Sequence, residues 1–276
     1  MKKIIKTLLS MIADLWQNRV LIFRLSINDF KTRYAASLMG IFWAFVQPII
    51  TVLIYWFVFE KGLRAGAQAM GGVQVPFVLF LISGLVPWFF FADALPNGTA
   101  SLTSYSYLVK KVVFKISILP VVKVMASIYV HAFFVLVMIT IFWAYGYAPD
   151  LYTLQVIYYS FATFVLALGL SYLTSAIVVF FRDLSEIINI VLQILVWATP
   201  IMWNIETSLT GGVIRTILKA NPMYYIVSGY RNAMINKVWF WETPGQTLYF
   251  WGITAVILAA GMLVFKNLKK HYADVL

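Results

Sequence analysis

The sequence predicts an all-α integral membrane protein with six transmembrane helices, and three observations carry this prediction. Hydrophobic residues make up 62% of the 276 residues and charged residues only 11%, with a mean hydropathy of +0.87. Soluble domains are closer to half apolar and a quarter charged. Six apolar windows of about 20 residues are each long enough to cross a bilayer as a helix. The basic residues lie mainly between these windows, where they set the orientation of a membrane protein.

The first 32 residues predict an amphipathic helix that lies on the membrane surface. Apolar residues recur at helical spacing from Ile4 to Trp16, and the early lysines fall off that stripe. Asp14 interrupts the apolar run and no small-residue cleavage site follows, which argues against a signal peptide. Packing of this helix on another protein chain is the alternative, and the two interpretations are compatible.

The six predicted spans cover residues 38–59, 75–95, 121–144, 154–181, 187–204 and 247–265. Arg182, Asp183 and Glu186 separate the fourth span from the fifth, because three neighbouring charges are costly in hydrocarbon. Six crossings place both termini on one side of the membrane. That side holds fifteen of the 21 Lys and Arg residues. The positive-inside rule therefore predicts cytoplasmic termini.

Two connections between the spans have a helical pattern of their own. Residues 101–120 form a predicted cytoplasmic loop with a short helix, which ends at Pro120. Residues 205–246 lie on the opposite side, and a loop of that length without structure is uncommon. Gly211-Gly212 and Asn221-Pro222 divide it into two short helices. We expect these helices to be re-entrant or interfacial.

Several kinds of chemistry are missing from the sequence. There is no cysteine and no G-x-x-x-x-G-K-[ST] motif, so a thiol site and ATP binding through a P-loop are excluded. His131 and His271 lack metal-ligand spacing, and no metal site is predicted. Asp93 is the only acid well inside an apolar window, so a hydrogen-bonded role for His131 is favoured over a proton relay. The basic residues form no single patch, so no nucleic-acid partner is expected.

Residues 33–50 read RYAASLMGIFWAFVQPII and resemble the R-Y-x-x-S-x-[LM]-G-x-x-W-x-x-x-x-P segment of a known permease family. This family comprises the polysaccharide-export permeases of the ABC transporter superfamily, which serve O-antigen, capsule and teichoic acid export. Four further segments resemble the family in the same order: SGLVPWFFFADAL (83–95), VVFFRDLSEI (178–187), TPIMW (199–203) and NPMYYIVSGYR (221–231). Residues 60–74 and 204–213 match no pattern of the family.

The resemblance implies a single transmembrane permease domain over residues 1–276. This domain has an interface segment (1–32), a six-helix core (38–265) and a cytoplasmic tail (266–276). It implies a homodimer with two copies of a separate P-loop ATPase in the cytoplasmic (inner) membrane. ATP and Mg²⁺ would be bound by that ATPase, so this chain is expected to carry no cofactor and not to be an enzyme. The implied substrate is a lipid-linked polysaccharide, with O-antigen foremost, which crosses through a channel at the dimer interface.

Two sets of residues are candidates for the substrate path. The first lies on one helical face of the first span, where flat aromatic rings suit the C–H faces of sugars: Phe42, Phe45, Trp56 and Phe59. Lipid contact or helix packing is the alternative for each of them. The second set steps by four residues along the fifth span: Asn189, Gln193 and Trp197. These side chains either bridge helices or face a wet channel.

The remaining candidates lie at the cytoplasmic surface. Arg33, with Tyr34, is a candidate for binding a lipid pyrophosphate, since a guanidinium forks onto phosphate oxygens; a membrane anchor is the alternative. The resemblance implies a coupling helix that docks on the ATPase, with anionic lipid as the other possible partner, at Lys110, Lys111, Phe114 and Lys115. Arg182, Asp183 and Glu186 are a second candidate contact, for which an i,i+4 ion pair between Arg182 and Glu186 is the alternative.

Three other functions stay open at this point. An ABC permease for capsular polysaccharide, teichoic acid or a small lipid or drug would have the same fold. A glycan-transferring membrane enzyme would need an acid–base pair beside a polar cavity, and none is recognisable in the sequence. A secondary carrier would be favoured by inverted internal symmetry, which the sequence does not display.

Overall fold

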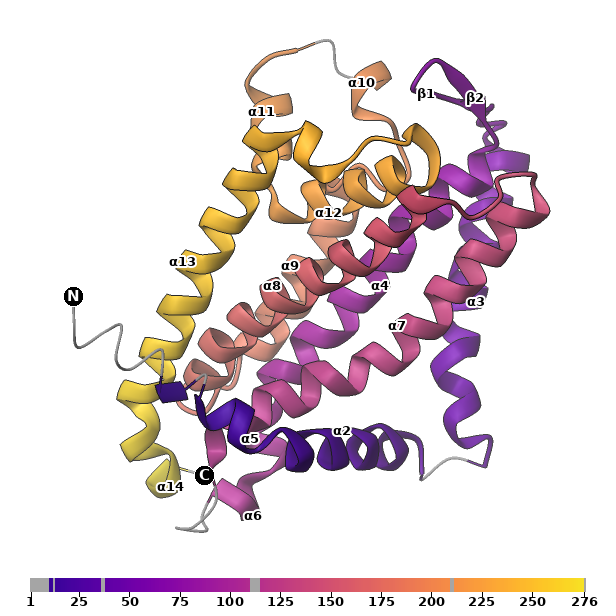
Figure 1. Ribbon diagram of the computed structural model, residues 1–276. Coiled ribbons are helices and arrows are strands. Elements are labelled where there is room, and N and C mark those ends of the chain that lie inside the picture. The colour runs from indigo at the N-terminus through magenta and orange to yellow at the C-terminus, as the bar shows by residue number, and fades with distance from the viewer. Residues whose placement is uncertain (1–9, 12, 36–37, 110–114, 209–210, 276) are drawn as a thin grey trace.

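The computed structural model describes residues 10–11, 13–35, 38–109, 115–208 and 211–275 and gives a helical bundle with one small β-hairpin (Figure 1). Most of the apolar stripe that we predicted between residues 4 and 16 lies outside the described residues. The same holds for Lys110, Lys111 and Phe114.

Five helical segments are long and apolar enough to cross a membrane: Gly40–Gly62, Phe77–Thr99, Ile116–Ala144, Leu151–Val178 and Pro244–His271. Their α-helical parts are α3 (Trp43–Trp56), α4 (Phe77–Thr99), α7 (Leu119–Ala144), α8 (Gln155–Val178) and α13 (Pro244–Leu268). Short turns extend them: η1 (Gly40–Phe42), η2 (Phe57–Gly62), η3 (Ile116–Ile118), η4 (Leu151–Leu154) and η7 (Lys269–His271). They coincide with five of the six predicted windows, so the helical multi-pass fold class is confirmed.

The fifth predicted window differs from the others. Its helix, α9 (Leu184–Ala198), has 15 residues and is about 22 Å long at 1.5 Å per residue. This is less than the roughly 30 Å of a bilayer core. Thr199 is extended, with φ −79° and ψ 129°, because Pro200 disfavours a helical conformation in the residue before it. The prediction of a continuous helix over 187–204 is therefore wrong at its outer end.

A buried arginine holds the chain after this break. Arg231 donates to the carbonyl of Pro200 (2.6 Å) and to that of Ile201 (2.7 Å). Its guanidinium also lies 3.6 Å from the centroid of the Phe80 ring. Its side chain is only 5% exposed, so Arg231 is packed in the interior of the bundle and is not a solvated loop charge. A buried arginine has to find acceptors, and two carbonyls freed by the break supply them.

The segment after the break consists of short helices, as the sequence predicts. They are α10 (Ile205–Ser208), α11 (Val213–Ala220) and α12 (Pro222–Arg231), followed by the turns η5 (Asn232–Asn236) and η6 (Phe240–Glu242). Gly212 precedes α11 with φ 94°, a conformation that suits glycine. Asn221 caps α12 by accepting from the Met223 amide at 3.0 Å. The two predicted punctuation points are thus confirmed. At the same end of the bundle, β1 (Gln68–Met70) pairs with β2 (Val73–Val75) (Figure 1).

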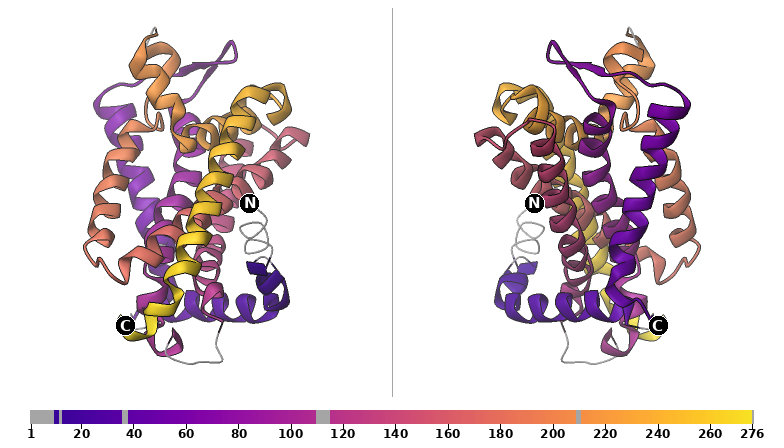
Figure 2. Two further views of the ribbon diagram at one scale, coloured as in Figure 1. Left: turned by 90° about the vertical axis from the view of Figure 1, so that its left-hand side faces the viewer. Right: turned by 90° about the vertical axis from the view of Figure 1, so that its right-hand side faces the viewer.

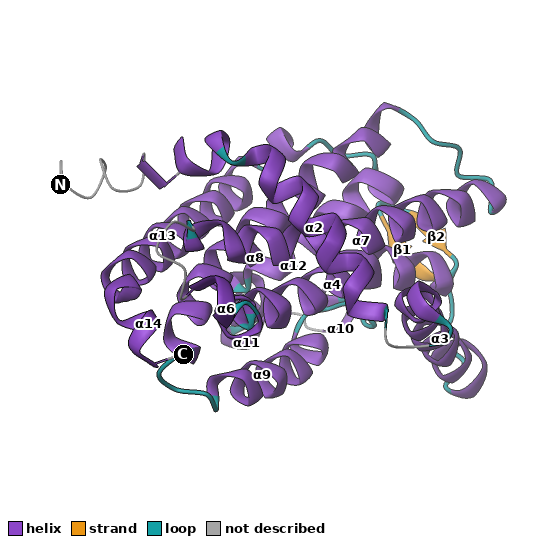
Figure 3. Ribbon diagram, turned by 90° about the horizontal axis from the view of Figure 1, so that it is seen from below, coloured by secondary structure: helices purple, strands orange, loops and turns teal. Residues whose placement is uncertain are grey.

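Helix α4 is the centre of the bundle, with 78% of its apolar window buried, whereas only 6% of the window that contains α3 is buried. Helices α7 and α8 pack on α4, and α13 packs on α8 (Figure 3). Helices α8 and α13 approach each other closely at Gly261. A Cβ added to Gly261 would lie only 2.5 Å from the Gly169 carbonyl oxygen. Small residues allow this approach between membrane helices.

Helix α2 (Arg19–Tyr34) crosses the end of the bundle where the C-terminal helix α14 (Tyr272–Val275) also lies (Figure 1). It packs on α7 of its own chain, with Ile22, Ser26 and Asp29 buried. The Ser26 hydroxyl is 2.9 Å from that of Tyr129. Two of the three buried residues are polar, so this helix attaches by hydrogen bonds and ion pairs as well as by apolar contact. Two short helices, α5 (Ser101–Ser104) and α6 (Ser106–Val109), lie at the same end.

Candidate functional site

Helices α3 and α9 are exposed along most of their length on the same side of the bundle (Figure 2), and both pack on α4. Within α3 only Ala44 is fully buried, and within α9 only Ile188 and Leu192. Both helices are strongly apolar. A single copy of the chain therefore presents two apolar helices that it does not cover itself.

The aromatic residues predicted to line a substrate path on α3 differ in their surroundings. Phe42 is 55% exposed. Phe45 packs on Phe133, with ring centroids 4.4 Å apart, and Phe59 stacks on Phe77 at 5.7 Å. Trp56 is partly buried against the core and faces the Lys61 ammonium at 5.5 Å. Within one chain, Phe45 and Phe59 therefore have the contacts of the packing alternative, and their role in a path stays a prediction.

The polar and aromatic ladder predicted on α9 lies on its open face. Asn189 and Gln193 are exposed, and Trp197 is 56% exposed. None of these three side chains bridges to another helix of the same chain in the part that the structure describes. Polar side chains on an otherwise apolar exposed face are available to a second protein copy, to water or to a substrate. Whether the ladder bridges to a helix of another copy or faces a wet channel stays a prediction.

Arg33 and Tyr34 lie where α2 meets α4 and α7. Arg33 contacts the Asp93 carboxylate at 3.0 Å and the Asp29 carboxylate at 3.2 Å. Burial opposes the charged guanidinium, but Asp93 and Asp29 outweigh it and raise the pKa of Arg33. Arg33 thus ties the surface helix to α4 by a charge pair on each side. Whether it also binds pyrophosphate stays a prediction.

Asp29 lies at the centre of a charge cluster that consists of Asp29, Arg33, Asp93, Lys123 and Tyr105. Its Oδ1 accepts from the Lys123 ammonium at 2.7 Å and from the Tyr105 hydroxyl at 2.8 Å. Burial, together with the Asp29 carboxylate, raises the pKa of Tyr105 well above its ordinary value, so its hydroxyl stays a donor. The carboxylates of Asp29 and Asp93 balance the charges of Arg33 and Lys123. Most of this cluster was missed from sequence, because its members come from four separate segments.

The candidate coupling residues that the structure describes lie at the end of the bundle that α2 crosses. Lys115 pairs with Asp14, which joins the loop to the N-terminal segment. Arg182, Asp183 and Glu186 are all exposed at the turn between α8 and α9. The alternative i,i+4 ion pair between Arg182 and Glu186 is not among the ion pairs of the described residues. Their exposed side chains remain available to a partner.

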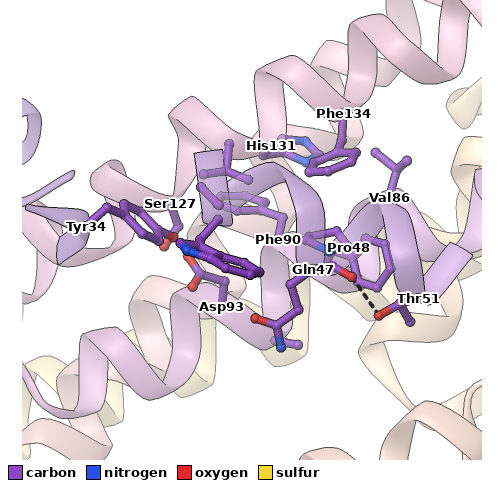
Figure 4. A pocket seen from close by; sticks show the side chains of 15 residues that line it. Tyr34, Gln47, Pro48, Thr51, Val86, Phe90, Asp93, Ser127, His131 and Phe134 are labelled. Carbon is purple, nitrogen blue, oxygen red and sulfur yellow. Dashed lines mark hydrogen bonds between the residues drawn. The ribbon is translucent and has the colours of Figure 1, made fainter. Parts of the chain in front are cut away.

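A cavity of about 310 Å³ lies between α3, α4 and α7, close to the charge cluster (Figure 4). Its polar lining includes Tyr34, Gln47, Asp93, Ser127 and His131. Sequence reasoning singled out Asp93 and His131 but did not place them in one cavity. His131 Nε2 is 2.9 Å from the Ser160 hydroxyl and 3.1 Å from that of Tyr230, which supports a helix contact for this side of the ring.

The described residues contain no group of three or more His, Cys, Asp or Glu side chains that would hold a metal ion. The main features of the described surface are the two exposed apolar helices α3 and α9, the ion-paired surface helix α2, and the exposed charges at one end of the bundle. Exposed apolar helices of this kind are typical of a protein embedded in a membrane.

Comparison with known proteins identifies the family. The family model described as "ABC-2 type transporter" matches residues 20–235, which is most of the chain. The chain belongs to the ABC-2 type transporter family.

Similar proteins include two Klebsiella pneumoniae proteins named "O-antigen export system permease protein RfbA", 28% and 27% identical over 251 residues. That alignment covers 90% of this chain and 92% of each relative. A Myxococcus xanthus protein of the same name is 25% identical over 267 residues, 97% of this chain and 99% of the relative. The family and these names confirm the resemblance to polysaccharide-export permeases and indicate a membrane transport subunit rather than an enzyme.

Proposed function

We propose that this chain is the membrane subunit of an ATP-driven exporter that moves a lipid-linked polysaccharide, O-antigen in particular, across the cytoplasmic membrane. The similarity to O-antigen export permeases along nearly the whole chain carries this proposal. ATP and Mg²⁺ bind a separate ATPase, two copies of which join two copies of this chain.

The exposed faces of α3 and α9 support the homodimer. An apolar helix with an exposed polar ladder is out of place against lipid alone, because amides in hydrocarbon are costly without partners. If two copies meet through α3 and α9, Asn189, Gln193 and Trp197 face the interior of the dimer, where water and sugar hydroxyls satisfy them. Phe42 lies at the cytoplasmic mouth of that space. The glycan channel is accordingly placed between the two copies.

In this proposal the chain crosses the membrane six times and has both termini in the cytoplasm. Helix α9 supplies the fifth crossing, with the non-helical residues 199–204 completing the distance, and α11 and α12 dip back into the outer half. The Arg231 contacts to Pro200 and Ile201 satisfy the backbone groups that such a broken helix would leave unpaired in a bilayer. The bias of basic residues towards the end with α2 supports the cytoplasmic placement.

The exposed cytoplasmic end supplies the contact with the ATPase. Lys110, Lys111, Phe114 and Lys115 form one contact, and Arg182, Asp183 and Glu186 at the α8–α9 turn form the other. In the same proposal, Arg33 and Tyr34 stand at the entrance for the lipid carrier. Pyrophosphate would have to compete with Asp29 and Asp93 for Arg33, so binding there would release α2 from α4.

The test is reconstitution. The chain is co-purified with its proposed partner ATPase and placed in proteoliposomes, and ATP hydrolysis is measured with and without lipid-linked O-antigen. Stimulated hydrolysis together with transfer of the glycan is expected. A lipid-linked capsular oligosaccharide serves as the comparison substrate. Transport by this chain alone, or hydrolysis that no lipid-linked glycan affects, would contradict the proposal.

A further inference from the structure

The cavity between α3, α4 and α7 is lined by residues of one copy of the chain, including the exposed Trp43 and Gln47 of α3. Figure 4 shows Tyr34, Ser127 and Asp93 together at one end of it and His131 with Phe134 at the other. Its volume of about 310 Å³ is at the low end of ligand sites, which suits a small head group rather than a polymer.

Two polar atoms in the cavity wall have no hydrogen-bond partner. The Ser127 hydroxyl oxygen and His131 Nδ1 are both unpaired, and their residues are only 1% and 5% exposed. A buried polar group without a partner loses its hydration without compensation, so such groups are rare in native interiors. Both residues line the same cavity, which indicates that something hydrogen-bonding occupies it.

The charge of the lining selects the kind of occupant. Asp93 is the only Asp or Glu among the described lining residues, and no Lys or Arg is among them. Asp93 Oδ2 contacts Arg33, whereas Oδ1 accepts from Arg33 and from Asn97. Each carboxylate oxygen accepts two hydrogen bonds, so Oδ2 retains capacity for one more. A carboxylate oxygen with a free lone pair accepts a hydrogen bond from a hydroxyl donor.

The rest of the wall is apolar apart from Thr51, with small and aliphatic residues as well as four aromatic ones. Trp43, Phe89, Phe90 and Phe134 surround the polar groups. Aromatic faces favour the C–H side of a saturated ring. Side chains that hydrogen-bond to hydroxyl groups therefore lie beside flat aromatic rings. A ligand with a polyhydroxylated saturated ring can use both.

We propose that this cavity binds an uncharged, hydroxyl-rich head group on a membrane-anchored chain, and specifically a sugar ring. The hydroxyls of this ring donate to Asp93 and contact Ser127 and His131, and one face stacks on the aromatic wall. The choice of a sugar over another neutral polyol rests on the proposed function. This proposed site lies within one copy, whereas the proposed channel lies between two copies. Its ligand is a sugar ring and not a pyrophosphate.

The experiment uses the intact complex with its ATPase in nanodiscs and a photoreactive octyl β-D-glucoside with a diazirine in its alkyl chain. Mass spectrometry maps the labelled peptides. We expect labelling on α3, α4 and α7, with octyl β-D-maltoside competing at least tenfold better than octyl phosphate or octanol. Equal competition by octyl phosphate would show an anion site, and equal competition by octanol an apolar site. Either result, or labelling elsewhere only, overturns the proposal.

Two variants test the residues. Ser127→Leu fills the cavity from α7, and Gln47→Leu removes a polar lining group from the exposed α3, where folding is less at risk. We expect at least a tenfold loss of specific labelling with the first variant and about threefold with the second. Ser104→Leu, an exposed serine outside the cavity, is the matched control and should label normally.

Unchanged labelling in folded Ser127→Leu and Gln47→Leu would refute the assignment. Hydrolysis is measured in the same samples. If lipid-linked O-antigen still stimulates ATP hydrolysis while the glucoside is not bound, the cavity proposal fails and the proposed function stands.

Discussion

At the scale of one residue, the structural role of Arg231 could not be predicted from the sequence. In the sequence it is one more basic residue in a loop between spans. In the structure it is buried and donates to carbonyls that the break after α9 leaves free. Nothing local distinguishes it, because its acceptors lie about 30 residues away in the sequence.

Arg231→Lys is expected to destabilise the chain although it keeps the charge. Lysine is a point donor and cannot fork onto two carbonyls while stacking on Phe80. We expect a loss of about 2–4 kcal/mol, of the size seen when a buried charge loses its partners. The thermal unfolding midpoint in detergent measures it. Arg24→Lys on the exposed face of α2 is the control, and equal midpoints for the two variants would contradict this account.

Arg33→Ala separates the two roles considered for that residue. Without it, Asp29 keeps Lys123 and Tyr105, and Asp93 keeps Asn97. Because Asp93 is 38% exposed, solvent screening limits the stability loss to about 1 kcal/mol. A pyrophosphate role further requires a weaker apparent affinity for lipid-linked glycan in the ATPase assay. If that affinity stays at the wild-type value, Arg33 serves only to tie α2 to α4.

At the scale of elements, five of the six predicted apolar windows coincide with helices long enough to span a membrane in the described residues, and the pairs Gly211-Gly212 and Asn221-Pro222 predicted α11 and α12. The windows worked because the length of an apolar run is a local property. Helix α9 ends at Ala198 because Pro200 disfavours a helical conformation at Thr199. The apolar window ignored this local signal because it counts only hydrophobic residues. The Asp29 cluster and the cavity join α2, α4 and α7, and such long-range contacts cannot be deduced from spacing along the chain.

The contact between α8 and α13 gives a matched pair of glycine variants. A Cβ on Gly261 would lie 2.5 Å from a backbone oxygen of α8, which cannot move aside without shifting the helix. A Cβ on Gly252 of the same helix meets nothing within 4 Å. We expect Gly261→Ala to lower stability by about 1–3 kcal/mol, as overpacking does. Gly252→Ala should be neutral or slightly stabilising. The unfolding midpoints of both in detergent check this, and a harmless Gly261→Ala would contradict the packing.

Helix α11 is tied to α10 by a pH-sensitive link. Glu206 pairs with Lys219 at 3.0 Å and with Arg215. Partial burial works against its charge, but the two cations outweigh it and lower the pKa of Glu206 below 4.5. The link is therefore complete above about pH 4.5 and is lost as the pH falls through the lowered pKa. Amide exchange in α11, corrected for its intrinsic pH dependence, should lose protection in wild type as the pH falls through the lowered pKa of Glu206. Glu206→Gln should show that loss already at pH 7.

At the scale of the whole molecule, one copy leaves two apolar helices uncovered, and this incompleteness is the central feature of the account. The family and the relatives identify a transport subunit, and in the proposed dimer the second copy meets the exposed faces of α3 and α9. The sequence predicted the residues of the α9 ladder but not that they point away from their own chain. That orientation depends on which face of α9 packs on α4.

Cross-linking between copies tests this claim most directly, because the natural sequence has no cysteine. Gln193→Cys on α9 is assembled with the ATPase in nanodiscs and treated with bismaleimides of increasing length. Thr140→Cys on the exposed side of α7 is the control. The account predicts covalent dimers through residue 193 that no longer transport lipid-linked O-antigen, and no dimers through residue 140. Monomers at every reagent length, in a complex that still exports the glycan, would contradict it.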